Sequence, residues 1–185
     1  MIKETLKDAE SRMKGAIQSL ELDLSSIRTG RASSALVDRL LVEYYGAPTP
    51  ILQLASISVP EPRSLMIKPF DPKTMKDIER AILASDLGIT PNNDGKAIRL
   101  NLPPLTEDRR KELAKQVKTR VEEARVSTRN VRRDVMKDLK ELETEKIISE
   151  DERKNGEHEL QKLTDKMIEE VEHIGEKKHN EIMEV

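Results

Sequence analysis

Residues Thr106–Ile148, TEDRRKELAKQVKTRVEEARVSTRNVRRDVMKDLKELETEKII, are predicted to form one uninterrupted helix, around which the rest of the chain is arranged. It contains neither glycine nor proline, and at 1.5 Å per residue it would span roughly 64 Å. A stripe with steps of three or four residues covers one face of an α-helix, so this face is predicted to pack in a core. The stripe consists of Leu113, Val117, Val121, Ala124, Thr128, Val131, Val135, Leu139 and Leu142.

A row of cationic side chains runs beside this apolar stripe, at Lys111, Lys118, Arg125, Arg129 and Arg132. At 100° per residue the five lie within an arc of about 60°, centred about 100° from the apolar face. Ten Lys or Arg against three Asp or Glu occur from residue 109 to 133, whereas six against twelve occur from 149 to 185. The net charge of −2 therefore hides a basic segment. This asymmetry indicates either a polyanion contact or a solvated helix that acidic neighbours balance.

The composition favours long solvated helices around an aliphatic core. Charged residues make up 37% of the 185 residues, apolar residues 36% and aromatic residues 2%. No apolar run is long enough to span a bilayer, and the first residues lack the layout of a signal peptide. The absence of cysteine excludes disulfides, thiolate catalysis and cysteine zinc sites. It also fits a reducing compartment, so we expect a cytoplasmic protein.

Two further helical segments are expected to pack with the long helix. One runs from Met1 to about Ile27, and the other follows a capping-box pattern at Ser149–Glu152. Neither they nor the long helix can bury an apolar stripe alone, which predicts a three-helix bundle made of residues 1–30 and 105–185. Gly156 and Gly175 are expected to be weak points in the last helix.

Between these helices the composition changes and predicts an inserted domain at residues 31–104. All nine prolines lie between Pro48 and Pro104, and all three aromatic residues lie in the same part of the chain. A helix is predicted from Pro72 to Asp86, with Asp71 as its N-cap. The absence of βαβ alternation favours an α+β fold with a small β/α/β insert. Strands are predicted at 40–45, 55–59, 65–70, 89–90 and 97–102, with turns at 46–48 and 93–95.

No group of residues predicts catalysis. All three histidines lie on the last predicted helix, where Glu170–His173 and Glu176–His179 each match a Glu-x-x-His pattern. Di-metal sites in bundles draw such motifs from two different helices, whereas both copies here share one acidic helix. We therefore expect no enzyme, no metal and no other cofactor. A bundle metalloprotein that uses His173 and His179 is the alternative of the enzyme class.

The cationic row is the best indication of function. Arginine presents a planar fork suited to phosphate oxygens, and helical spacing places several such forks along one line. Because the bundle has no aromatic residue, base stacking is not expected, and recognition of shape and phosphates in structured nucleic acid is favoured. The competing hypothesis is a helical adaptor that binds acidic protein surfaces. Salt dependence and sensitivity to RNase distinguish the two.

Four motifs in this order make the chain resemble the bacterial ribosome recycling factor family over its whole length. They are RTGRAS at 28–33, VEYYG at 42–46, LPPLTE at 102–107 and RNVRRD at 129–134. The resemblance implies a three-helix bundle with an inserted domain, hinged into an L-shaped two-domain arrangement. It also implies a monomer without enzymatic activity that binds the post-termination ribosome. With elongation factor G and its GTP hydrolysis, such a protein promotes subunit dissociation and release from mRNA.

The resemblance also implies which residues act. Contacts with large-subunit ribosomal RNA are expected from the bundle at Arg132 above all, and at Arg129, Arg133, Arg28 and Arg31. The cationic row adds two further expected RNA contacts, Arg125 and Lys118. The hinge is expected at Thr29, Gly30, Arg31, Leu102, Pro103, Pro104 and Leu105.

Overall fold

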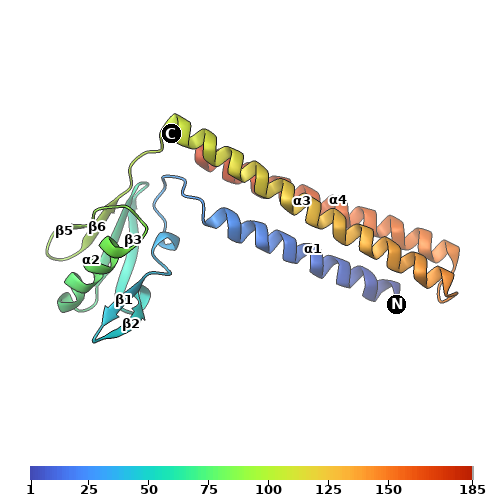
Figure 1. The fold of residues 1–185 in the computed structure, drawn as a ribbon, viewed down its shortest axis with the longest axis horizontal. Coiled ribbons are helices and arrows are strands. Elements are labelled where there is room, and N and C mark those ends of the chain that lie inside the picture. Colours follow the sequence, from blue (N-terminus) through green and yellow to red (C-terminus); the bar gives the residue numbers. More distant parts are fainter. Residues whose placement is uncertain (185) are drawn as a thin grey trace. The chain divides into compact units, whose positions relative to one another are not determined.

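The computed structural model describes residues 1–184, which form two compact units. The first unit contains Met1–Ile27 and the chain from Glu107 onward, and the second contains Arg28–Thr106. Both units appear in Figure 1. No helix in the described part of the chain combines the length and the apolar character needed to cross a membrane.

The first unit is a bundle of three long helices, each of which packs against the other two (Figure 1). They are α1 (Ile2–Ser25), α3 (Glu107–Thr144) and α4 (Glu150–Met183). The predicted stripe of α3 is buried along nearly its whole length, and only Leu142 is half-buried. Because burial of aliphatic side chains drives such packing, helical periodicity correctly predicted the core face of α3. The buried residues of α3 are Leu113, Val117, Val121, Ala124, Thr128, Val131, Val135 and Leu139.

The long helix α3 ends at Thr144, so the prediction that it continues to Ile148 was wrong. Lys146 has a φ of 59°, and its N–H donates to Glu143 O at 2.9 Å. The next amide donates to Leu142 O, also at 2.9 Å. These bonds form a Schellman motif, in which the left-handed residue is usually glycine. Because a lysine takes that conformation here, the absence of glycine did not indicate a continuous helix.

The capping box that was predicted at the start of α4 is confirmed. Ser149 Oγ accepts a hydrogen bond from Glu152 N at 3.2 Å, and Glu152 Oε2 accepts one from Ser149 N at 2.7 Å. The two bonds satisfy backbone donors that the first turn of a helix leaves unpaired. The chain therefore reverses between α3 and α4 within a few residues.

Gly156 and Gly175, which were expected to be weak points of α4, are buried at helix contacts. A Cβ on Gly175 would lie 2.5 Å from Val121 Cγ2, and one on Gly156 would lie 3.4 Å from Leu139 Cδ1. Because glycine has no side chain, it lets neighbouring helices approach closely. Both glycines belong to the packed face of α4.

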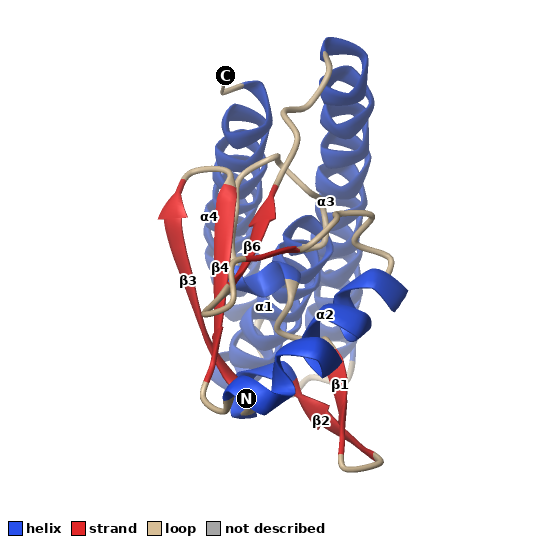
Figure 2. Cartoon of the chain, turned by 90° about the vertical axis from the view of Figure 1, so that its left-hand side faces the viewer, coloured by secondary structure: helices blue, strands red, loops and turns tan. Residues whose placement is uncertain are grey.

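The second unit is a small α+β domain with two antiparallel sheets and a helix (Figure 2). A four-stranded sheet has the order β3-β4-β6-β5, and β1 pairs only with β2. The strands are β1 (Leu41–Tyr44), β2 (Ala47–Pro50), β3 (Ala55–Glu61), β4 (Ser64–Pro69), β5 (Asn92–Asn93) and β6 (Ile98–Asn101). The core contains Val37, Val42, Ile51, Leu54, Ala55, Leu65, Ile67, Met75, Ile78, Ile82, Leu87, Ile98 and Leu100.

The β1–β2 hairpin differs from the predicted turn at 46–48. The chain reverses at Tyr45 and Gly46, whose φ angles of 49° and 78° suit a two-residue type I′ turn. Pro48 and Pro50 then lie in β2, which was not predicted because proline donates no ladder hydrogen bond. Since β2 has a partner on one side only, it tolerates them as an edge strand does.

The helix of this unit follows the prediction with shifted bounds, whereas one predicted strand does not. Asp71 caps a short 3-10 helix (Pro72–Thr74), and its carboxylate accepts a hydrogen bond from Lys73 N at 3.0 Å. Helix α2 (Met75–Ala84) continues directly from it and ends before the predicted Asp86. The strand predicted at 89–90 was wrong, because β5 comprises residues 92–93.

Candidate nucleic-acid interface

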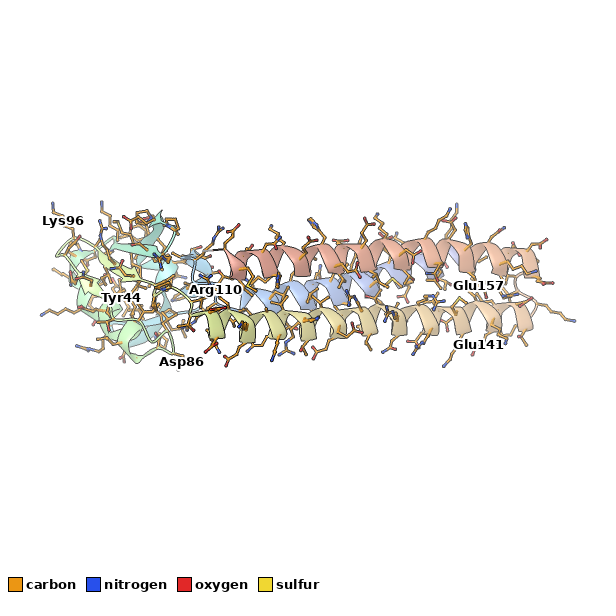
Figure 3. All side chains as sticks on the ribbon, turned by 90° about the horizontal axis from the view of Figure 1, so that it is seen from above. Tyr44, Asp86, Lys96, Arg110, Glu141 and Glu157 are labelled. Carbon is orange, nitrogen blue, oxygen red and sulfur yellow. The ribbon has the colours of Figure 1, made fainter. Side chains whose placement is uncertain are left out.

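The cationic row of α3 lies beside α4. Arg125 and Arg132, seven residues apart, each contact a side chain of α4. Figure 3 shows that many charged side chains project from the bundle between Arg110, at the start of α3, and Glu141, near its end. The contacts of each predicted RNA-binding residue decide which of these cations can bind a further anion.

Arg125 is committed to the bundle itself. Its guanidinium contacts Glu122 on α3 and Glu172 on α4, both at 3.0 Å, and its side chain is only 30% exposed. The hydrogen bond with Glu122, opposed by desolvation and assisted by the charge of Glu172, raises the pKa of Arg125. For this one arginine, the structure therefore agrees with the alternative that acidic neighbours balance the basic helix. Because two carboxylates already pair with its guanidinium, we expect Arg125 to bind phosphate only weakly.

The other predicted cations of α3 are much less neutralised. Arg129 reaches Glu122 only at 4.0 Å, and Arg132 donates from Nε to the neutral amide of Gln161 at 2.9 Å. Within residues 1–184, neither Arg133 nor Lys118 forms a hydrogen bond or an ion pair. We refer to Lys118, Arg129, Arg132 and Arg133 as the cationic face.

A shallow depression of about 640 Å³ adjoins the cationic face on α3. Its one carboxylate, Asp134, is held by Arg12 of α1 at 2.8 Å. Lys137 contributes a third cation that sequence reasoning missed, although it lies one helical turn after Arg133 and the spacing could have indicated it. Local excess of positive charge of this kind concentrates anions at a surface. The depression is lined by Asn130, Arg132, Arg133, Asp134, Met136 and Lys137.

Arg28 and Arg31, predicted as RNA contacts of the bundle, belong to the second unit. The two terminal nitrogens of Arg28 donate to Leu87 O at 2.7 Å and to Asp86 O at 3.0 Å. These carbonyls follow the end of α2, so Arg28 fastens the first connecting segment to the small domain. Arg31 is exposed.

The predicted hinge residues form two neighbouring segments within the second unit. Gly30 has a φ of 78°, and a Cβ on it would lie 3.3 Å from Leu105 Cγ. Ala32 N donates to Pro62 O at 2.7 Å, and Leu102 N donates to the adjacent carbonyl of residue 63 at 2.8 Å. Both segments are therefore fastened to the turn between β3 and β4.

Among the described residues, no group of three or more acidic or histidine side chains is placed to hold a metal ion. The Glu-x-x-His patterns on α4 therefore do not come together with further ligands in this part of the chain. The chemistry that the candidate site supports is the binding of anions by guanidinium and ammonium groups.

These features describe one class of protein: a three-helix bundle that is interrupted by a small α+β domain and carries a cationic face on α3. The family model of ribosome recycling factor matches residues 20–183. The chain belongs to the ribosome recycling factor family. Two relatives named ribosome-recycling factor, from Roseiflexus sp. (strain RS-1) and Heliobacterium modesticaldum, are 55% and 54% identical to it, with full coverage of both chains.

Two solved structures agree with this assignment. A solution structure of the ribosome recycling factor is 45% identical, with a TM-score of 0.79 over 100% of this chain and 98% of the other. A second is 44% identical with a TM-score of 0.67, and both chains are fully covered. It is described as models for the T. thermophilus ribosome recycling factor and the E. coli elongation factor G bound to the E. coli post-termination complex.

Proposed function

We propose that this protein is a ribosome recycling factor that binds the post-termination ribosome through large-subunit ribosomal RNA. Together with elongation factor G, and with GTP hydrolysed by that partner, it promotes subunit dissociation and release from mRNA. It acts in the cytoplasm as a monomer, catalyses no reaction itself and uses no cofactor. Membership of the family supports this proposal.

The observation that carries the docking step is the cationic face of α3. Arg132 uses only Nε within the bundle, and Arg133 has no partner among the described residues. Side chains three or four residues apart on a helix have Cβ atoms about 5–6 Å apart, so several cations can reach one stretch of phosphates. A guanidinium can bind a phosphate through two parallel hydrogen bonds. We infer that RNA phosphates are bound by Arg132, Arg129, Arg133 and Lys118. Arg125 contributes little to this binding.

The second step of the proposal concerns the two connecting segments. Gly30 in a left-handed conformation packs against Leu105, and both segments are fastened to the β3–β4 turn. We infer that the small domain turns about these segments when elongation factor G acts on it. A few residues at element ends commonly absorb such a rotation. The motion would disrupt the contacts between the ribosomal subunits.

Co-sedimentation with purified ribosomes across a series of salt concentrations tests the docking step. Arg132→Ala is expected to weaken binding about tenfold, as loss of one charged hydrogen-bonding group does. The salt slope should fall by about one. Arg120→Ala is the matched control, because Arg120 is also an exposed arginine of α3 but is paired with Glu123 at 3.1 Å.

The control should bind within about twofold of the unmodified protein, as exposed ion pairs contribute little. Normal binding and normal recycling by a folded Arg132→Ala variant would contradict the docking role. Digestion of ribosomal RNA with RNase should abolish binding. Binding that survives this treatment would indicate an acidic protein surface as the partner.

A further inference from the structure

We infer that Gln161 of α4 is a positioning residue for Arg132, which it holds in one orientation without neutralising its charge. The inference rests on the proposed docking of Arg132 to phosphate. Arg132 Nε donates to Gln161 Oε1 at 2.9 Å, and Gln161 Nε2 donates to Asp165 Oδ1 at 2.8 Å. The three side chains form a hydrogen-bonded relay, which runs from Asp165 through Gln161, one helical turn earlier on α4, to Arg132 on α3.

The chemistry of the two neighbours fixes the orientation of the Gln161 amide. A guanidinium has only donors, so it requires the amide oxygen, and a carboxylate has only acceptors, so it requires the amide nitrogen. Both neighbours therefore demand the same orientation. Asp165 thereby directs the oxygen of Gln161 toward Arg132.

The relay engages Arg132 at Nε alone. Its two terminal nitrogens have no partner among residues 1–184, and they form the side of the fork that can bind a phosphate in a bidentate manner. Long side chains lose rotational freedom when they bind, and a side chain held beforehand loses less of it. Arg133, in contrast, has no partner in the described structure and must be ordered on binding.

Arg125, seven residues before Arg132 on α3, also contacts a side chain of α4, but there the contact neutralises the arginine. There Arg125 faces Glu172, a carboxylate, at 3.0 Å. At Arg132 the partner from α4 is a neutral amide. The same type of interhelical contact thus neutralises one arginine and leaves the full positive charge on the other. This difference makes Arg132 the best prepared phosphate ligand of the row.

Replacement of Gln161 separates orientation from charge. Gln161→Ala should weaken ribosome binding about threefold to tenfold, because Arg132 must then be ordered on binding. The salt slope should not change, since no charge is lost. Gln161→Glu should keep Arg132 in place but neutralise it, so that affinity and salt slope both fall, the slope by about one.

Two measurements test the relay. The first is NMR relaxation of the Arg132 Nε–H group in the free, full-length protein, where Gln161→Ala should lower its order parameter and Gln161→Glu should not. The second is ribosome binding by Gln161→Ala in an Arg132→Ala background, where it should have no further effect. In an Arg133→Ala background its effect should persist in full, which provides the control.

The outcomes distinguish this inference from the proposed function. If Arg132→Ala binds ribosomes normally, the docking role itself is wrong. If Arg132→Ala impairs binding but Gln161→Ala does not, the relay is wrong. The relay is also wrong if Gln161→Ala weakens binding by the same factor in the Arg132→Ala background as in the unmodified protein. An unchanged order parameter of the Arg132 Nε–H group in Gln161→Ala would also overturn it.

Discussion

A methyl group on Gly175 of α4 would lie 2.5 Å from Cγ2 of Val121 on α3. Carbon atoms in favourable contact are about 3.5–4.0 Å apart, so the two helices are closer here than any residue with a Cβ allows. Val121 cannot easily move aside, because a β-branched side chain in a helix has one strongly preferred rotamer. The approach of α4 to α3 therefore depends on the absence of a side chain at Gly175.

Gly175→Ala is expected to lower the free energy of unfolding by about 1–3 kcal/mol, the usual cost of overpacking a core. Gly15→Ala on α1 is the matched control, since nothing lies within 4 Å of its added Cβ. That substitution should stabilise the protein by about 0.5–1 kcal/mol through helix propensity. Urea denaturation followed by circular dichroism measures both, and stabilisation by both variants would contradict the close contact.

The pairing of Arg125 with Glu172 predicts that Arg125 supports stability more than RNA binding. Arg125→Ala should lower the free energy of unfolding by about 1 kcal/mol, the upper range for a partly exposed ion pair. It should weaken ribosome binding less than Arg132→Ala. Glu172→Gln should release the charge of Arg125 and strengthen binding at low salt. Equal binding losses in the two arginine variants would show that the pairing does not restrain Arg125.

The capping box of α4 predicts a pH-dependent contribution to stability. Hydrogen bonds from the backbone N–H and the side chain of Ser149 hold the pKa of Glu152 below its ordinary value of 4.5. Because the folded-state pKa is the lower one, this stabilisation is present above the unfolded-state pKa and is lost as pH falls through the folded-state pKa. Glu152→Gln should remove it.

Denaturation midpoints of the unmodified protein and Glu152→Gln, measured from pH 7 to pH 3, test this prediction. The difference should be constant near neutrality and disappear in acid. Lys162→Ala, which breaks the exposed pair with Glu159 on the same helix, serves as the control for general charge effects. A difference that grows as pH falls would contradict the assignment.

Gly30 and Gly46 share a φ of 78° but differ in their surroundings. A Cβ on Gly30 would meet Leu105 at 3.3 Å, whereas one on Gly46 would meet nothing within 4 Å. Valine at either position incurs similar backbone strain, which costs roughly 1–2 kcal/mol and corresponds to about a tenfold effect. Gly30→Val should slow subunit dissociation by elongation factor G and GTP about tenfold, and Gly46→Val should not.

Binding to ribosomes should change less than dissociation in Gly30→Val. A light-scattering assay of subunit splitting and a co-sedimentation assay measure the two properties separately. Equal loss of both, or loss of neither, would count against a turning motion at this segment. A Gly46→Val variant with the same defect would show that backbone strain anywhere in the small domain suffices.

Regular local patterns in the sequence predicted much of the fold. The apolar period of α3 predicted its core face, Ser149 and Glu152 predicted the start of α4, and Asp71 predicted a helix cap. Each of these features depends on residues within one or two turns of each other, so it is visible in the order of residues alone. The family motifs likewise lie in short contiguous segments.

Features that depend on distant residues could be found only in the tertiary structure. The close contact of Gly175 with Val121 is one example, because the two residues are far apart in the sequence. Helical spacing does not show which partners Arg125 and Arg132 have, because Glu172 and Gln161 lie on another helix. Lys146 ends α3 and Pro48 lies in a strand because their surroundings outweigh local propensity.

The apolar face of α3 and its flanking row of cations can both be predicted from the order of residues, because both follow from helical periodicity. Which of those cations are paired with a carboxylate depends on the packing of the helices, because α4 places Glu172 beside Arg125 and the amide of Gln161 beside Arg132. Electrostatic interactions depend on distances in space, and the packing of separate helices sets those distances.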